Sequence, residues 1–474
     1  MKHHLRYALI ALGLLVSPVD AGTIYVDTAG NGGAAANSGT SDTASPQATG
    51  TAATVVSTTV TLDTNTNLTG IVTTAGLTQS AINIAGATNA NRTIFWITGV
   101  TGCTGTGACS ITVDVAPTGV TTNNWVVGGR YLWPSAATVN VVEGALGLSG
   151  GQDAVTFNTS PASRTGIFLT LRNPGTTSTG NIVIQGKAGT LPVLTMSSGV
   201  AAFFNQNTQS GFTISNLSLS NSGTGGAIQN SSSYLVLQNV KIAGGAGTGT
   251  LSGVAQIIGG EISGSSTDGI TSSSILRVKG AYIHGNSGNG ITVSVANPSA
   301  FIQNNLIVGN TLKGISLSGT STSQSHSTIV DHNTIYGNLS DGFSVTNANT
   351  VVTLTNNILQ DNGQTSGYNV DWIAGNAQLF GVHSNNVFYQ SGAGTPTGNL
   401  LNLTTNATEL TTSPQFVATG SNNFAIANAS PAAGAGTPSN LPSIGTSLTA
   451  SFPDIGAAQR QVTAGGQGII SAAP

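Results

Sequence analysis

The chain has 474 residues but little charge: 12 Lys and Arg plus 15 Asp and Glu make up 6% of it, and the net charge is −3. Ordinary soluble domains hold about a quarter charged residues, so Ser, Thr and Asn must supply most of the polar surface. A hydrophobic content of 39% is enough for a sizeable core and argues against a disordered chain. The 64 glycines follow no Gly-X-Y period, which excludes collagen, and no basic stripe is present for a nucleic acid or an anionic membrane.

The first 21 residues have the three parts of a secretory signal peptide. Lys2 and Arg6 precede an apolar run over residues 7–16, and small residues follow up to Ala21. We expect cleavage after Ala21 and a secreted, extracellular protein. The apolar run is too short to span a bilayer, and no later stretch reaches that length, so we expect no membrane span.

Residues 22–150 contain a first strand near Thr23 and then a region rich in Thr, Val and Ala. This region lacks the repeat that organises the rest of the chain. We predict a β-rich insertion or cap, because a stack of repeats needs covered ends to avoid edge-to-edge growth. Cys103 and Cys109 lie close in sequence and could form a local disulfide in an oxidising compartment.

A degenerate repeat of about 24 residues runs from about residue 210 onwards. Each unit contains a short apolar segment, and we take its last apolar residue as an anchor. The anchors are Leu219, Ile242, Ile262, Ile283, Ile307, Ile335, Leu359 and Phe388. Three residues before each anchor comes a residue that is mostly Asn or Gly, the types that tolerate left-handed backbone at a sharp bend. These residues are Asn216, Asn239, Gly259, Gly280, Asn304, His332, Asn356 and Asn385.

A glycine follows most anchors by seven residues and opens a further short strand with alternating apolar residues. One unit therefore holds three short strands separated by Asn or Gly corners, and no stretch shows a helical period. We predict an all-β chain with a parallel β-helix over residues 151–400, in which Asn can form a ladder along a corner. Residues 401–474 are expected to be a C-terminal closing segment or cap. A two-sheet sandwich also suits the composition, but it does not explain the fixed offsets.

Several segments are typical of one superfamily. They include Asn333-Thr-Ile-Tyr-Gly-Asn338 in the repeat, the start at Thr23, and closing segments at residues 413–417, 430–436 and 454–457. In these the chain resembles secreted bacterial right-handed parallel β-helix proteins of the pectin-lyase-like superfamily. The resemblance implies that the β-helix is right-handed. It does not fix an activity, because this superfamily contains lyases, hydrolases, epimerases and non-catalytic proteins.

The resemblance directs attention to the residues beside the Gly-led strands, where superfamily hydrolases carry paired aspartates and lyases carry calcium-binding acids with an Arg or Lys base. Asp268 and Asp341 are three coils apart in this row, about 14 Å, which is too far for a hydrolase acid pair. The best catalytic candidates are Lys313, Asp341 and Asp361. In a lyase the acids would hold a cation, calcium being the candidate, while Lys313 removes a proton. The alternative is a surface ion pair with an unrelated corner aspartate; no other metal site is predicted.

Polar residues at the outward positions of the Gly-led strands are candidates for contacts with a sugar. They are Thr271, Thr292, Ser316, Ser344, Asn369 and Asp371, with Arg277 and Lys279 on a neighbouring sheet. A weaker row after the anchors contains His284, Tyr336 and Gln360. Asp331 and His332 are adjacent in sequence but are expected to diverge, because one faces outward from a strand and the other sits at a corner.

Three functions are compatible with the sequence. The charge-poor strands favour a secreted protein that engages an extracellular polysaccharide or a surface through its lateral face, by binding rather than by catalysis. The second is a polysaccharide lyase or glycoside hydrolase, as the resemblance allows. The third is an ice- or mineral-binding protein, because rows of Thr and Ser resemble regular water-ordering surfaces. Whether the protein is an enzyme is not decided by the sequence.

Overall fold

The computed structural model describes residues 23–26, 29, 43, 45–74, 80–87, 94–114, 116–120, 123–128, 141–143, 154–157, 160, 169–172, 181–196, 204–206, 211–229, 234–294, 299–318, 327–346, 351–372, 381–392, 397–437, 454–463 and 466–470. The expected signal peptide, residues 1–21, lies outside this set. Within the set there is no α-helix. No helix in the described ranges has the length and apolar character required to cross a membrane.

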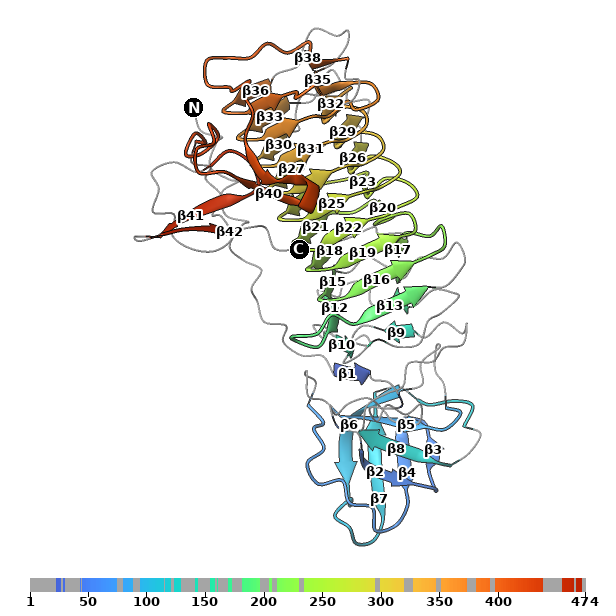
Figure 1. Cartoon of the computed structure of the whole chain (residues 1–474). Coiled ribbons are helices and arrows are strands. Elements are labelled where there is room, and N and C mark those ends of the chain that lie inside the picture. The colour runs from blue at the N-terminus through green and yellow to red at the C-terminus, as the bar shows by residue number, and fades with distance from the viewer. Residues whose placement is uncertain are drawn as a thin grey trace, which may run out of the picture.

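Parallel strands stack into three long sheets that form the sides of a solenoid (Figure 1). Sheet 1 has 11 strands: β1 (Thr23–Val26), β10 (Ala154–Phe157), β12 (Asn181–Gly186), β15 (Gly211–Ser215), β18 (Leu235–Gln238), β21 (Ala255–Ile258), β24 (Leu276–Lys279), β27 (Ala300–Gln303), β30 (Ser327–Asp331), β33 (Val351–Thr355) and β36 (Gly381–Ser384). Sheet 2 has nine: β13 (Val193–Met196), β16 (Ser218–Asn221), β19 (Lys241–Gly244), β22 (Glu261–Ser263), β25 (Tyr282–His284), β28 (Leu306–Val308), β31 (Thr334–Tyr336), β34 (Ile358–Gln360) and β37 (Val387–Tyr389).

Sheet 3 contains the Gly-led strands. Its seven strands are β20 (Thr250–Leu251), β23 (Ile270–Ser272), β26 (Ile291–Ser294), β29 (Ile315–Ser318), β32 (Phe343–Val345), β35 (Tyr368–Trp372) and β38 (Gly398–Leu401). A four-stranded sheet adjoins it through β17: β9 (Val141–Glu143), β11 (Leu169–Arg172), β14 (Phe204–Gln206) and β17 (Ile228–Gln229). One coil takes a strand from each sheet in turn, as in β24, β25 and β26, and each pairs in parallel with its counterpart in the next coil. The predicted parallel β-helix is confirmed.

The repeat read from the sequence matches the register of the coils. All eight anchors are buried, and sheet 2 pairs each anchor with the next along the chain. All eight residues three positions earlier have a positive φ, such as 56° at Asn304 and 54° at His332. At Gly314 an added Cβ would lie 2.5 Å from the carbonyl oxygen of Gly342, so the Gly row lets adjacent coils approach closely. The core between the three sheets is one continuous apolar cluster.

Two ladders of mostly buried asparagine side chains run along the corners. Between sheets 1 and 2, the Nδ2 of Asn305 donates to the Oδ1 of Asn333 at 2.9 Å. The same contact repeats to Asn357 and Asn386. Between sheets 2 and 3, the second ladder comprises Asn286, Asn310, Asn338, Asn362, Asn369 and Asn399. Each asparagine of the first ladder directly follows a left-handed corner residue, as Asn305 follows Asn304. The spacing of the repeat predicted the corner residues but not this row of asparagines.

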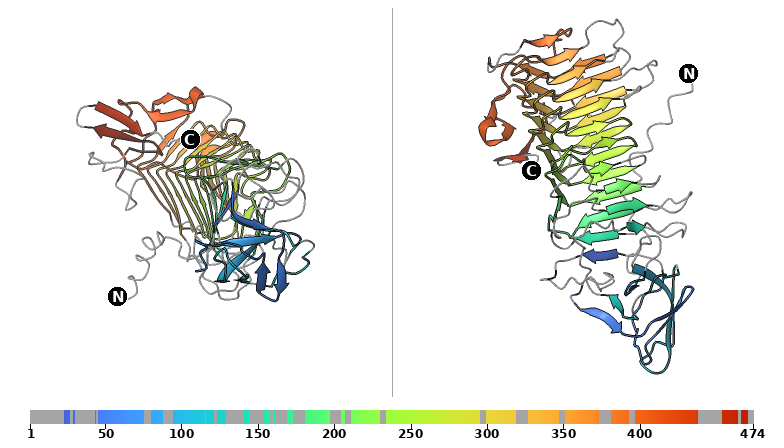
Figure 2. Two further views of the ribbon diagram at one scale, coloured as in Figure 1. Left: turned by 90° about the horizontal axis from the view of Figure 1, so that it is seen from below. Right: turned by 90° about the vertical axis from the view of Figure 1, so that its right-hand side faces the viewer.

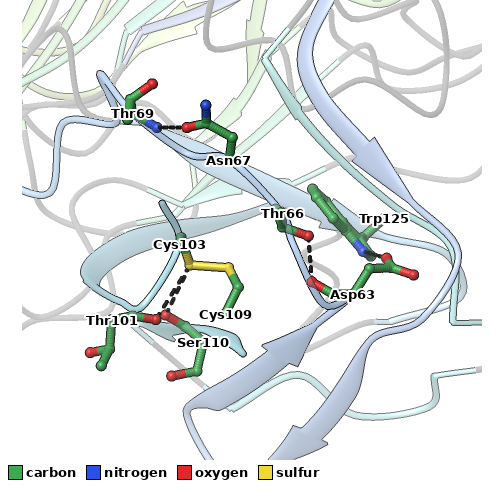
Figure 3. Close-up of a disulfide and its surroundings, with 9 residues drawn as sticks. All are labelled: Asp63, Thr66, Asn67, Thr69, Thr101, Cys103, Cys109, Ser110 and Trp125. Carbon is green, nitrogen blue, oxygen red and sulfur yellow. Dashed lines mark hydrogen bonds between the residues drawn. A yellow bond between two sulfur atoms is a disulfide. The ribbon is translucent and has the colours of Figure 1, made fainter. Parts of the chain in front are cut away.

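Residues 46–128 contain a seven-stranded antiparallel unit. Its strands are β2 (Pro46–Gly50), β3 (Thr54–Val56), β4 (Thr59–Leu62), β5 (Ala81–Ile84), β6 (Ile94–Thr101), β7 (Cys109–Val113) and β8 (Trp125–Gly128). The unit has its own core, in which Cys103 and Cys109 form a disulfide and the Trp125 Nε1 donates to the Asp63 Oδ2 at 2.7 Å (Figure 3). Trp96 belongs to the apolar core of the solenoid instead. The unit therefore covers the end of the solenoid near β1 (Figure 2).

The described C-terminal residues turn back along the side of the solenoid. Leu410 pairs with Val387 as the start of a further coil, and then β39 (Phe416–Ala418), a 3-10 turn (Thr419–Ser421) and β40 (Asn423–Ile426) follow. Phe416 and Phe424 lie against Tyr336, with ring centroids 6.0 and 5.2 Å away. Residues 410–437 and 454–457 pack over Ile358, Val387 and Thr334, so they cover the outer face of β31, β34 and β37. A separate hairpin, β41 (Gln459–Thr463) and β42 (Gly466–Ile470), ends the described chain.

Candidate functional site

The Gly-led strands of sheet 3 place a row of polar side chains on the outside of the solenoid. The register pairs Thr271 with Thr292, then Ser316, Ser344 and Asp371 in successive coils. Strand alternation turns these side chains away from the core. Thr292, Ser316 and Ser344 are at most 9% exposed, because neighbouring side chains cover their short hydroxyls. The less covered members of this row are therefore Thr271 and Asp371 at its two ends, and Asp371 is the ionisable one.

The residues that precede the glycines hold adjacent coils together. The Oδ1 of Asp268 accepts the backbone N–H of Asn289 at 2.7 Å, and its Oδ2 accepts a threonine hydroxyl at 2.6 Å. The Asn289 side chain accepts the N–H of Lys313 at 2.9 Å. The Oδ1 of Asp341 accepts the N–H of Tyr368 at 2.9 Å. Both oxygens of Asp268 thus serve the packing of the coils.

Lys313 joins this row to the row on the strands. Its Nζ lies 3.0 Å from the Oδ2 of Asp341 and donates to the Oγ of Ser344 at 2.7 Å. The Ser344 hydroxyl donates in turn to the Oδ2 of Asp371 at 3.4 Å. The Lys313 side chain keeps 25% of its surface exposed, whereas Asp341 keeps 8%. We call these four residues, Lys313, Asp341, Ser344 and Asp371, the Lys313 cluster.

Asp371 is the least satisfied member of the Lys313 cluster. Burial raises its pKa and the negative charge of Asp341 raises it further, while Lys313 and the hydrogen bond from Ser344 lower it; the net pKa is raised. Its Oδ1 is buried and has no hydrogen-bond partner in the described part of the chain. A carboxyl group with a raised pKa and one unused oxygen is suited to exchange a hydrogen bond or a proton with a ligand.

Asp361, the third predicted catalytic residue, is held elsewhere. It occupies a left-handed corner with a φ of 53°, directly after β34. Its carboxylate accepts hydrogen bonds from the Gln360 side chain at 2.8 Å and from the Ser391 N–H at 2.6 Å. None of these contacts joins it to Lys313 or Asp341. The structure therefore brings two of the three predicted residues together.

Asn369 does not face outward, and that prediction is wrong. Its side chain is fully buried, accepts from Asn362 at 2.8 Å and donates to Asn399 at 2.7 Å. The reason is a longer turn before β35, which makes the register pair Phe343 with Val370. The extra length shifts Asn369 from the strand into the corner, where it takes a place in the second ladder.

Arg277 and Lys279 lie on the outer face of sheet 1, a different side of the solenoid from the Lys313 cluster. Arg277 is exposed, and its guanidinium lies 5.3 Å from the ring centroid of Phe301 in the next coil. Burial lowers the pKa of Lys279. The structure therefore does not place these cations in the same site as the sheet 3 row.

Asp331 and His332 meet, contrary to the expectation that they diverge. The His332 Nδ1 lies 2.9 Å from the Asp331 Oδ1, and both side chains are at most 6% exposed. The positive φ of His332 bends its side chain back over the preceding strand, which permits the contact. Thr355 and Asn356 also donate to the Asp331 Oδ1 at 2.9 Å each. The pair is a buried link between coils at the corner of sheets 1 and 2.

A second cluster of ionisable side chains lies on the outer face of sheet 2. The Glu261 carboxylate lies 2.9 Å from the Lys241 Nζ and 3.2 Å from the His284 Nε2. The rings of Tyr282 and His284 stack with centroids 4.0 Å apart. Of these residues, only His284 was predicted from the sequence. The other three could have been predicted from the repeat, because Lys241, Glu261 and Tyr282 each directly precede an anchor and so share one row.

The described residues contain no group of three or more His, Cys, Asp or Glu side chains arranged to hold a metal ion. In the Lys313 cluster the positive charge beside Asp341 belongs to Lys313 itself. The chemistry of these donors therefore gives calcium no evident place there.

Comparison with known proteins agrees with this architecture. The model of the family described as "Right handed beta helix region" matches residues 162–323 and 198–394. No curated protein matches the sequence significantly.

Among solved structures, the chain is similar to the A-module of the mannuronan C-5 epimerase AlgE4 of Azotobacter vinelandii, with 15% identity, 56% of this chain and 72% of that chain covered, and a TM-score of 0.31. It is also similar to pectate lyase Pel9A, with 13% identity, 66% and 88% covered, and a TM-score of 0.37. Residues 162–394 therefore match a right-handed β-helix region, in agreement with the three parallel sheets of the solenoid.

Proposed function

We propose that the protein binds an extracellular polysaccharide along the outer face of sheet 3, with the Lys313 cluster as the main contact. The observation that carries this proposal is the buried Oδ1 of Asp371, which has no hydrogen-bond partner among the described residues although Lys313 and Ser344 lie beside it. A buried polar atom without a partner is costly, so a rotation of the Asp371 side chain that brings this oxygen to a ligand hydroxyl would be stabilising. An extracellular ligand also requires the export that residues 1–21 lead us to expect.

The geometry favours binding over catalysis. The Nζ of Lys313 is already engaged by Asp341 at 3.0 Å and by the Ser344 hydroxyl at 2.7 Å, so it is poorly placed to act as a base on a substrate. Both oxygens of Asp341 are already engaged, one by Lys313 and one by a backbone N–H. Asp361 is engaged outside the cluster. The low exposure of Thr292, Ser316 and Ser344 also leaves too few open hydroxyls for a regular ice- or mineral-binding face.

Affinity electrophoresis against gels that contain plant, algal or bacterial polysaccharides tests the proposal. We expect at least one gel to retard the wild-type protein and Asp371→Asn to reduce the retardation about tenfold. Asp361→Asn is the matched control: it makes the same isosteric change at a corner aspartate outside the cluster and should behave as wild type. The proposal fails if no polysaccharide retards the wild-type protein, or if the two variants are equally affected.

One observation favours a second candidate, a polysaccharide lyase or hydrolase. The raised pKa of Asp371 beside the Asp341 carboxylate is the arrangement expected of a general acid. Such an enzyme would release unsaturated or reducing ends from the polysaccharide that it binds, and Asp371→Asn would abolish the release. Absence of both products from the wild-type protein, with and without added calcium, would eliminate this candidate.

A further inference from the structure

The four residues Lys241, Glu261, Tyr282 and His284 form a compact group on sheet 2, which we call the Glu261 cluster. Adjacent coils place Lys241, Glu261 and Tyr282 side by side in one row. His284 follows Tyr282 by two residues on β25, so both rings stand on the same face and stack. This is a different side of the solenoid from the Lys313 cluster on sheet 3.

The composition of the chain makes this convergence informative. Charged residues are only 6% of the sequence, so solubility depends on Ser, Thr and Asn and does not require a charged network at this place. A surface ion pair of this kind contributes only about 0–1 kcal/mol to stability. Neither solubility nor stability therefore accounts for three ionisable side chains and a tyrosine at one point.

The cluster remains open to ligands from outside the solenoid. The C-terminal segment covers Tyr336, Ile358 and Val387 on later strands of the same sheet. In the Glu261 cluster, by contrast, Lys241 is 41% exposed and His284 29%. The Tyr282 hydroxyl has no hydrogen-bond partner among the described residues, and Lys241 keeps two N–H donors beyond the one directed at Glu261.

The charges indicate which ligand fits. The positive charge of Lys241 is offset by the negative charge of Glu261, so the cluster does not present the row of cations that a polyanion would need. It offers instead an aromatic surface, open N–H donors and a tyrosine hydroxyl that can both donate and accept. A sugar presents the complementary set, with apolar C–H faces and hydroxyl groups that also donate and accept.

We propose that the Glu261 cluster is a second saccharide-binding site, specific for neutral sugars and separate from the site on sheet 3. The sugar ring lies against the Tyr282–His284 stack, and its hydroxyls bond to the Tyr282 hydroxyl and the Lys241 ammonium group. Glu261 is a positioning residue that holds Lys241 and His284 in place. This inference adds a site to the polysaccharide binding proposed above, and together the two sites would let one molecule hold two polysaccharide chains.

Nuclear magnetic resonance of the full chain gives a readout that is local to this site. The probes are the neutral hexasaccharides cellohexaose and mannohexaose, with hexagalacturonate as the anionic comparison. The His284 ring signals, one set among the 6 histidines, are assigned with His284→Gln. We expect a neutral hexasaccharide to shift the His284 signals, and Tyr282→Ala to weaken the apparent affinity at least tenfold.

Control variants separate this site from the first and from a loss of folding. Tyr234→Ala removes a tyrosine that is 68% exposed outside the cluster and should leave the His284 shift unchanged. Asp371→Asn should also leave the shift unchanged, even where it abolishes binding on sheet 3. Tyr282→Phe keeps the ring and should retain part of the affinity. The proposal is overturned if no neutral sugar moves the His284 signals, if hexagalacturonate moves them more strongly, or if folded Tyr282→Ala binds as the wild type does.

Discussion

At the scale of single residues, the buried Asp331–His332 pair couples stability to pH. Burial alone would raise the pKa of Asp331, but the hydrogen bond and charge of His332 and the hydrogen bonds from Asn356 and Thr355 outweigh it and lower the pKa. A carboxyl group whose folded pKa is lowered contributes stability above its unfolded pKa of about 3.9. That contribution is lost as the pH falls below about 4 and through the lowered folded pKa.

We therefore expect Asp331→Asn to reduce the free energy of unfolding at neutral pH by about 1.5–3 kcal/mol, the range for a hydrogen bond to a charged group. As the pH falls below about 4 and through the lowered folded pKa, the difference from wild type should shrink, because the wild-type carboxylate becomes protonated. Urea denaturation at several pH values measures both effects. Asp371→Asn is the opposite case. The wild-type Asp371 carboxyl has a raised pKa, so its ionisation lowers the free energy of unfolding as the pH rises, and the substitution should remove that loss. A pH-independent deficit in Asp331→Asn would contradict this account.

At the scale of the element, the asparagine ladders link successive coils at the corners, as backbone hydrogen bonds link them along the strands. Asn333 is fully buried; its Nδ2 donates to Asn357 at 3.0 Å and to the Ile302 carbonyl at 2.8 Å. Its Oδ1 accepts from both the side chain and the backbone N–H of Asn305. One side chain thus satisfies polar groups in three coils, and buried polar groups of this kind need such partners.

Replacement of Asn333 by Ala should therefore be among the most destabilising single changes in the β-helix. Each buried polar group left without a partner costs about 1–3 kcal/mol, and more than one is orphaned here. We expect a loss of at least about 3 kcal/mol in the free energy of unfolding, measured by chemical denaturation. Asn216→Gly is the comparison: it keeps a residue that tolerates the positive φ of 52° and removes only a part-exposed contact with Asn239. Equal losses in both variants would show that the ladder has no special role.

The sequence predicts these elements unevenly, for physical reasons. The apolar anchors and the left-handed corners are local requirements of the backbone, so Ile283 and Asn304 could be assigned from their spacing. Side-chain direction at a corner is not local: Asn369 moved into the ladder because one turn is longer. Likewise, the contact between Asp331 and His332 depends on how a positive φ turns the ring, which spacing does not reveal.

At the scale of the whole molecule, different structures cover the two described ends of the solenoid. The antiparallel unit of residues 46–128 covers one end and inserts Trp96 into the solenoid core. The sequence indicated only a β-rich cap there, because antiparallel pairing joins strands far apart in the chain, such as β2 with β8. At the other end, Glu409 accepts the last amide of the first asparagine ladder, and the chain then turns back over sheet 2.

The returning segment should stabilise the later coils by covering apolar side chains rather than by capping strand edges. Deletion of residues 413–474 would expose Tyr336, Ile358 and Val387, which now pack against Phe416, Phe424, Ile426 and Ile455. Burial of each large apolar side chain is worth about 1.5–3 kcal/mol, so the loss should reach several kcal/mol. Circular dichroism should still show a β-rich fold, because the continuous core between the sheets is unchanged.

The truncated protein should denature at a lower urea concentration, bind a hydrophobic dye and self-associate through the exposed face of sheet 2. Deletion of residues 459–474 alone is the matched control, since it removes the β41–β42 hairpin but leaves the packing around Ile358 and Val387 intact. That shorter deletion should keep the wild-type midpoint and the wild-type oligomeric state. If the long deletion also kept the wild-type midpoint and bound no dye, the returning segment would be dispensable for the fold, and another role for it would have to be sought.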